Sequence, residues 1–126
     1  MATVLIDANV ILRYLINDDE DMAIESEMVI KDGACTLPEV LAEVVYVLRS
    51  VYKVERKEIA DKLLEVLEDI EIEHHNVMIR AIEIFSNTNL DFVDCVLIAY
   101  HEVEGMEIFS FDKKLNNRIK QVIDDK

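Results

Sequence analysis

The chain is predicted to fold as an α/β domain with a mainly parallel central sheet between two layers of helices. Short apolar segments rich in β-branched and aliphatic residues alternate along it with longer segments of helical apolar spacing. Apolar residues make up 52% of the 126 residues, which is enough for a substantial core. Because two glycines and one proline leave little material for linkers, residues 1–126 are expected to form a single domain.

Each element is expected from its own local pattern. Apolar runs predict short strands at residues 3–7, 34–37, 70–72 and 106–110. Apolar spacing of three and four predicts helices at residues 9–16, 21–31, 38–52, 55–67, 76–86, 91–104 and 112–119. Gly33 and Gly105 are expected at helix ends, and Pro38 suits a first helical residue. The all-helical stretch 38–67 predicts a protruding helical pair available as an interface, and the tail 124–126 is expected to be frayed.

The net charge of −14 restricts the kinds of partner the chain can have. It argues against nucleic-acid binding through a broad basic patch, but not against a nuclease whose acids hold metal cations. It also suits a basic protein partner. Cys35 and Cys95 lie in apolar surroundings and imply no disulfide framework. Without a secretory signal or an apolar run long enough for a membrane span, the chain is expected to be cytoplasmic and away from membranes.

Four acids occupy positions where the neighbouring residues are mostly apolar. Asp7 ends the first strand, Glu43 lies early in the helix after the second strand, Asp94 interrupts a nearly unbroken apolar run, and Asp112 follows the last expected strand. Acids are 27 of the 126 residues, so their placement rather than their number is informative. In an open parallel sheet, ligands bind outside the carboxyl ends of the strands.

Converging carboxylates repel one another unless a positive charge lies between them. Mg²⁺ or Mn²⁺, hard cations that prefer oxygen ligands, would relieve that repulsion. No histidine or cysteine cluster offers a competing zinc site, since the adjacent His74 and His75 point apart on a helix or strand. The four acids are therefore candidate metal ligands.

Three further polar residues have two readings each. Asp91 lies three residues before Asp94, and is either a helix cap or a further metal ligand. Asn9 is the cap of the first helix, a hydrogen-bond partner of Asp7 or of the metal's hydration shell, or both. Ser110 is either a plain strand residue or a contact for phosphate or carboxylate.

Four segments together resemble the PIN-domain ribonucleases, with the closest likeness to the small VapC toxins of prokaryotic toxin–antitoxin pairs. These segments span most of the chain in the family's order: Leu5-Ile6-Asp7-Ala8-Asn9, Leu37-Pro38-Glu39-Val40-Leu41-Ala42-Glu43, Asp91-Phe92-Val93-Asp94-Cys95, and Phe109-Ser110-Phe111-Asp112. The resemblance implies that Asp7, Glu43, Asp94 and Asp112 form one acidic metal site, with Asn9 beside the first acid. Ser110 stands where the family often has threonine, and so keeps the hydroxyl.

The activity implied by the resemblance is hydrolysis of RNA phosphodiester bonds with Mg²⁺ or Mn²⁺ as cofactor and no covalent intermediate. The family further implies a homodimer and a small antitoxin protein whose basic segment covers the site. Lys113, Lys114 and Arg118, close in sequence to Asp112, are candidate RNA contacts or else solvated surface charges.

Three alternative functions are to be compared with that of a toxin nuclease. A PIN-domain nuclease of housekeeping RNA processing has the same motifs, because toxin status depends on a neighbouring antitoxin. A non-cleaving PIN-like binding scaffold is disfavoured because all four acids are present. A receiver-like signalling domain requires two acids after its first strand, whereas Asp7 stands alone there.

Overall fold

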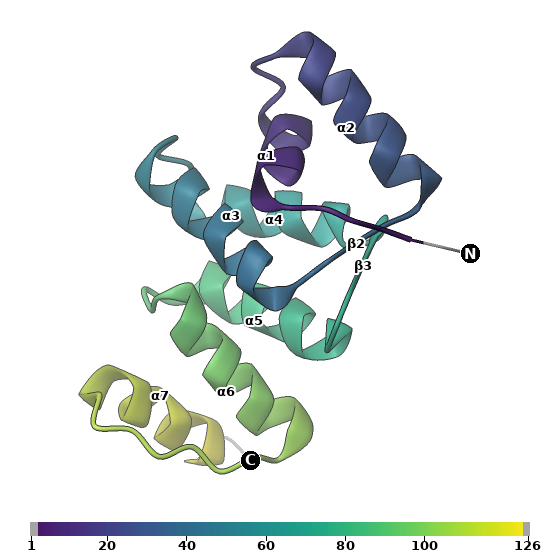
Figure 1. Ribbon diagram of the computed structural model, residues 1–126. Helices are drawn as coiled ribbons and strands as arrows, with labels where there is room; N and C mark the ends of the chain where they lie inside the picture. Colours follow the sequence, from purple (N-terminus) through teal and green to yellow (C-terminus); the bar gives the residue numbers. More distant parts are fainter. Residues whose placement is uncertain (1–2, 125–126) are drawn as a thin grey trace. The chain divides into compact units, whose positions relative to one another are not determined.

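The computed structural model describes residues 3–124, with side-chain environments through residue 120, and it divides into two compact units. The first unit is Met1–His75 and the second is Asn76–Lys126. Figure 1 shows the helices and strands of both units. The expectation that the chain forms one domain stays a prediction.

The first unit is built on a three-stranded parallel sheet. The strands are β1 (Val4–Leu5), β2 (Ala34–Thr36) and β3 (Ile70–Ile72), in the order β1-β2-β3. Val4 pairs with Ala34, and Ala34 pairs in turn with Ile70. The ladder continues past β1, because the Ile6 amide donates to the Cys35 carbonyl at 2.9 Å. The predicted parallel sheet is confirmed, with helices as the crossovers that parallel pairing requires.

Four helices complete this unit. They are α1 (Ala8–Ile16), α2 (Glu20–Gly33), α3 (Pro38–Ser50) and α4 (Arg56–Val66). Their inward stripes are fully buried, at Ile11, Ile30, Leu41, Leu48, Ile59 and Leu63. The predicted helical pair is present as α3 and α4, with Pro38 as the first residue of α3. Its role as an interface stays a prediction.

The second unit consists of three helices, α5 (His75–Asn87, which starts at the unit boundary), α6 (Phe92–Glu104) and α7 (Lys113–Asp124). Arg80 on α5 makes a two-pronged ion pair with Glu102 on α6, with nitrogen–oxygen distances of 2.7 and 3.2 Å. The Phe85 and Phe92 rings meet edge to face, 5.9 Å apart. Gly105 ends α6 in the left-handed region with φ 69°, as predicted, because glycine adopts that conformation without strain.

The predicted strand at 106–110 is wrong. Within the described residues this segment is irregular and pairs with no strand. Side chains bond parts of its backbone instead: the His101 ring lies 2.8 Å from the Met106 carbonyl, and the Asn116 amide donates to the Ser110 carbonyl at 2.8 Å. Phe109 and Phe111, which are 86% and 91% exposed, pair edge to face. A strand needs a hydrogen-bonded neighbour, and an alternating local pattern cannot supply one.

Two smaller differences concern the chain's last helix and its length. α7 continues to Asp124, beyond the predicted end at residue 119. Asp124, which was expected to belong to a frayed tail, is the last residue of α7, and residues 125–126 lie outside the described part of the chain. Among the helices of the described chain, none has the length and apolar character needed to cross a bilayer.

Candidate functional site

Asp7 begins the candidate site in the first unit. It follows β1 directly and caps α1: its carboxylate accepts a hydrogen bond from the Val10 amide at 3.1 Å. The cap is therefore Asp7, and the reading of Asn9 as the cap is wrong. Thr36, at the end of β2, donates its buried hydroxyl to the Ile6 carbonyl at 3.0 Å. This bond ties the residue before Asp7 to the neighbouring strand, so the carboxylate starts from a rigid base.

Glu43 lies in the second turn of α3, which begins two residues after β2 ends. Its side chain is exposed, whereas Leu41 and Val44 on either side are fully buried. The interpretation that the acid stands at an apolar position is wrong here, because a helix of 3.6 residues per turn directs residue 43 away from the buried stripe. α1 and α3 both start at the carboxyl ends of adjacent parallel strands, the edge where ligands bind in such sheets.

A groove of about 460 Å³ runs beside Asp7 in the first unit. Asn9 and Arg13 also line it, and the Arg13 Nε donates to the Asn9 side-chain oxygen at 3.3 Å. Arg13 additionally forms an ion pair with Asp18. Sequence reasoning missed Arg13, although its place four residues after Asn9 on an expected helix puts the two on one face. The groove thus contains a cation beside the first predicted acid.

Two neighbouring acids act on the Asp94 carboxyl in the second unit. Asp94, in the first turn of α6, is only partly exposed, and its burial raises the pKa of its carboxyl. The negative charges of Asp112 and Asp91 raise that pKa further. The positive charge of Lys114 acts in the opposite direction. The chain therefore gathers negative charge around Asp94, as expected of a cation site.

Asp91 occupies the cap position of α6, but its side chain makes no capping hydrogen bond. The prediction that Asp91 caps the helix is therefore confirmed for its position but not for a capping hydrogen bond. Its carboxylate instead adds to the negative charge felt by Asp94. The reading of Asp91 as a metal ligand stays a prediction.

Asp112 is held at the start of α7 by a small hydrogen-bond network. Its carboxylate accepts from the Leu115 amide at 2.9 Å, and its own amide donates to the Ser110 hydroxyl at 3.0 Å. Ser110 is therefore not a plain strand residue, since its hydroxyl orients the backbone of the acid two positions on. Asp112 is exposed, so this carboxylate also lies outside the buried core.

The donors in each unit are suited to a hard divalent cation. They are carboxylate oxygens, and the acids around Asp94 carry like charges that a cation would offset. No group of three or more Asp, Glu, His or Cys side chains among residues 3–120 is arranged closely enough to hold a metal ion. The chemistry of the donor set fits a divalent ion, whereas the predicted convergence of four acids stays a prediction.

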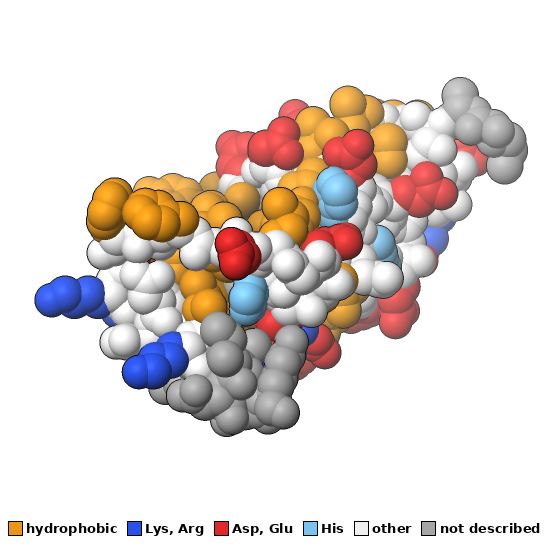
Figure 2. All heavy atoms as spheres, turned by 90° about the horizontal axis from the view of Figure 1, so that it is seen from below, with side chains coloured by type: hydrophobic (Ala, Val, Ile, Leu, Met, Phe, Trp, Pro, Cys, Tyr) orange, Lys and Arg blue, Asp and Glu red, His pale blue; other side chains and the backbone are white. Residues whose placement is uncertain are grey.

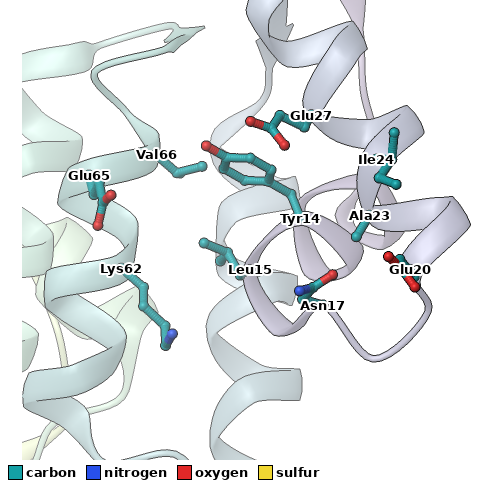
Figure 3. Close-up of a pocket in the computed structure, with 10 residues that line it drawn as sticks. All are labelled: Tyr14, Leu15, Asn17, Glu20, Ala23, Ile24, Glu27, Lys62, Glu65 and Val66. Atoms are coloured by element: carbon teal, nitrogen blue, oxygen red, sulfur yellow. The ribbon is translucent and has the colours of Figure 1, made fainter.

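A second pocket of the first unit, of about 450 Å³, contains none of the predicted residues. Figure 3 shows Tyr14 in its centre, with Glu27 beside the ring and Glu65 and Lys62 projecting from the helix opposite. Three glutamates and one lysine line it, so it is unsuited to an anionic substrate. The surface as a whole is similarly acidic, and Figure 2 shows Lys and Arg at only a few places on the face it presents.

A parallel sheet with helical crossovers and acids after its strands and at its helix starts defines an α/β fold of the PIN type. Residues 4–120 match the PIN domain family, which is a family of nuclease domains that generally use divalent metal ions. The chain belongs to the PIN domain family. No curated protein and no solved structure matches the chain significantly.

Proposed function

We propose that this PIN domain is a ribonuclease that hydrolyses RNA phosphodiester bonds with Mg²⁺ or Mn²⁺. The observation that carries the proposal is the charge arrangement at Asp94, where burial and the charges of Asp112 and Asp91 raise the carboxyl pKa. Burial and like charges disfavour the ionised form of such a carboxyl, and a bound cation would stabilise that form. Perturbed carboxyls of this kind are typical of functional sites.

The proposed ligands are Asp7 and Glu43 of the first unit and Asp94 and Asp112 of the second, with Asp91 as an additional acid. The metal supplies Lewis acidity for attack on the phosphodiester and for the charge of the leaving oxygen. The chain itself orients two of these carboxylates. The Val10 amide donates a hydrogen bond to Asp7, and the Leu115 amide donates one to Asp112. Fixed carboxylates lose little freedom when they bind an ion, which is the general basis of preorganisation.

We further propose that the chain is the toxin of a toxin–antitoxin pair and acts in the cytoplasm as a homodimer. The support is the resemblance to VapC proteins, which spans nearly the whole chain. A net charge of −14 favours a basic segment in the inhibiting partner, because charge complementarity directs association. Activity in housekeeping RNA processing is the alternative, and an inhibitory partner isolated with the protein would decide against it.

The test is RNA cleavage by the full chain, purified free of partners, with Mg²⁺, with Mn²⁺ and with EDTA. Asp94→Asn is compared with Glu104→Gln, which removes an exposed carboxylate at the other end of the same helix. We expect cleavage with either metal, none with EDTA, and a loss of about 100-fold or more in Asp94→Asn only. Cleavage that survives both chelation and Asp94→Asn would contradict the metal site.

Inactivity of the wild-type chain under all three conditions would instead support the non-cleaving scaffold. This conclusion requires mass spectrometry of the purified sample, because a bound inhibitor produces the same result. Analytical ultracentrifugation of that sample measures the proposed homodimer independently of its activity.

A further inference from the structure

We propose that a pocket of the second unit, between α7 and the loop after α5, binds a backbone phosphate of the RNA. The pocket has a volume of about 280 Å³ and is lined by Thr88, Asn89, Leu90, Lys114, Asn117 and Arg118. The inference rests on the proposed ribonuclease function and names the part of the chain that holds its substrate. It selects Lys114 and Arg118 from the three basic residues near Asp112 and leaves out Lys113.

α7 presents two of its cations, Lys114 and Arg118, to this pocket because of its helical periodicity. Leu115 and Ile119 are buried and fix the rotation of the helix. Lys114 and Arg118 each precede one of these anchors by a single residue and are four apart, so they share a face. The helix thereby holds two positive charges on one wall, where a phosphate can contact both.

The facing wall is a loop of fixed shape. The Thr88 hydroxyl donates to the Ile84 carbonyl at 2.9 Å and accepts from the Leu90 amide at 3.4 Å. Leu90 is 5% exposed, which anchors the end of the loop. Asn89, between these two residues, is exposed and adds an amide to the lining. An amide donor beside two cations is a composition suited to a phosphate.

The pocket also lies close to the acids of this unit. Lys114 is near enough to Asp94 for its charge to lower the pKa of that carboxyl. Asp112 precedes the helix that carries both cations. A phosphate held at Lys114 therefore leaves the neighbouring phosphodiester near the acids. This placement matters in a chain with 13 basic and 27 acidic residues, because the net negative charge disfavours an anion wherever cations do not gather.

The pocket of Figure 3 provides the contrast within the chain. Its lining contains Glu20, Glu27 and Glu65 against the single cation Lys62. RNA affinity comes largely from neutralised phosphates, so a net negative lining repels the backbone. The lining charges of these two pockets thus differ in sign, and the pocket near Asp94 and Asp112 is the basic one.

Fluorescence anisotropy with a labelled single-stranded RNA, in EDTA so that the proposed cleavage is off, tests the inference. Lys114→Gln and Arg118→Gln are compared with Lys113→Gln, which removes an exposed cation from the same helix outside the pocket. Each pocket variant is expected to bind about 5–10-fold more weakly and to lower the salt slope by about 0.7, the value for one lost phosphate contact. Lys113→Gln should match the wild type. Circular dichroism confirms that each variant is folded.

Equal losses in Lys113→Gln and Lys114→Gln, or no RNA binding by the wild type, would overturn the pocket as a site. A parallel cleavage assay with Mg²⁺ separates this failure from that of the proposed function. If the wild type cleaves and Lys114→Gln leaves KM unchanged, the ribonuclease stands and the pocket does not. If the wild type binds through Lys114 but never cleaves, the proposed function fails while the pocket stands.

Discussion

Asp7 in the first unit and Asp94 in the second are acids of the same proposed site in opposite physical situations. Asp7 is exposed and its carboxylate has a structural task, since it accepts the Val10 amide and caps α1. Asp94 is partly buried within a helical turn, and burial together with two neighbouring acids raises its pKa. One acid helps to hold its unit together, whereas the other costs its unit stability when it is charged.

The proposed metal ligands thus differ in whether their surroundings in the folded chain favour the charged form. A cap residue is stabilised as an anion by backbone amides at the helix start. Asp112 shares this property, because it accepts the Leu115 amide at 2.9 Å. Substitutions that remove the charge of a carboxylate but keep its shape therefore separate its structural role from its chemical one.

The largest effect is expected at Asp7 itself. Asp7→Asn should lower RNA cleavage by about 100-fold or more while Tm is nearly unchanged, because asparagine caps a helix as well as aspartate does. Asp7→Ala should lose cleavage to the same extent and also about 1 kcal/mol of unfolding free energy. Cleavage rates and thermal unfolding measure the two losses separately.

Asp19 provides the matched control, because it caps α2 through the Met22 amide at 3.1 Å. Asp19→Ala should destabilise the protein about as much as Asp7→Ala and leave cleavage per folded molecule unchanged. Equal loss of cleavage in both alanine variants would mean that Asp7 acts only as a cap.

The second-largest effect is expected from metal binding, which should raise the free energy of unfolding. If Mn²⁺ binds the folded chain alone, a concentration roughly one hundred times Kd adds about 2.7 kcal/mol to the unfolding free energy. Thermal unfolding with and without Mn²⁺ measures the shift, and Asp94→Asn and Glu43→Gln report on the two units separately. A full shift retained by Asp94→Asn would remove the second unit from the metal site.

The titration of Asp94 should appear in the pH dependence of stability without metal. Because its folded-state pKa is raised, its favourable contribution is complete below the unfolded pKa and is lost as pH rises through the folded pKa. Asp94→Asn should therefore have a higher Tm than the wild type at pH 7, and the difference should close as the pH falls below the unfolded-state pKa of aspartate. Asp61→Asn, at an exposed position on α4, should show no such gap.

The smallest effect compares one ion pair from each unit. Arg80 joins Glu102 by two bonds, and the Glu102 side chain is 16% exposed, whereas Lys31 and Asp69 meet at 3.1 Å with 54% and 36% exposure. Arg80→Gln should cost about 1 kcal/mol and Lys31→Gln less than about 0.5 kcal/mol, since exposed pairs are screened by solvent. Urea unfolding measures both losses of unfolding free energy. Equal losses would contradict the expectation that the less exposed pair contributes more.

Much of the fold could be predicted because it depends on local signals. The apolar runs at residues 34–37 and 70–72, the helix start at Pro38 and the helix end at Gly105 all follow from side-chain periodicity or backbone preference. The irregular conformation of residues 106–110 could not be predicted, because whether an apolar run forms a strand depends on a partner elsewhere in the chain. Gly33 was expected at the end of a helix, and it is the last residue of α2, with φ 122°. The predicted helix ended at residue 31, so a glycine marks the end of a helix only to within about two residues.

The candidate site divides in the same manner. The identities of Asp7, Glu43, Asp94 and Asp112 could be read from the sequence, as could the match of residues 4–120 to the PIN domain family. Their environments could not: the apolar neighbours of Glu43 suggested burial, yet its side chain is exposed. Neighbouring residues along a helix face different directions, so flanking residues are a poor guide to burial.

The sequence by itself therefore determined the class of fold, the family and the acids that belong to it, because these depend on residue types and their spacing. Only the tertiary structure decided that Asp94 feels the charge of Asp112 and that Lys114 and Arg118 line one pocket with Thr88, Asn89 and Leu90. Each of these is a contact across space. Electrostatic energy and hydrogen bonding depend on the distance between groups, which spacing along the chain does not specify.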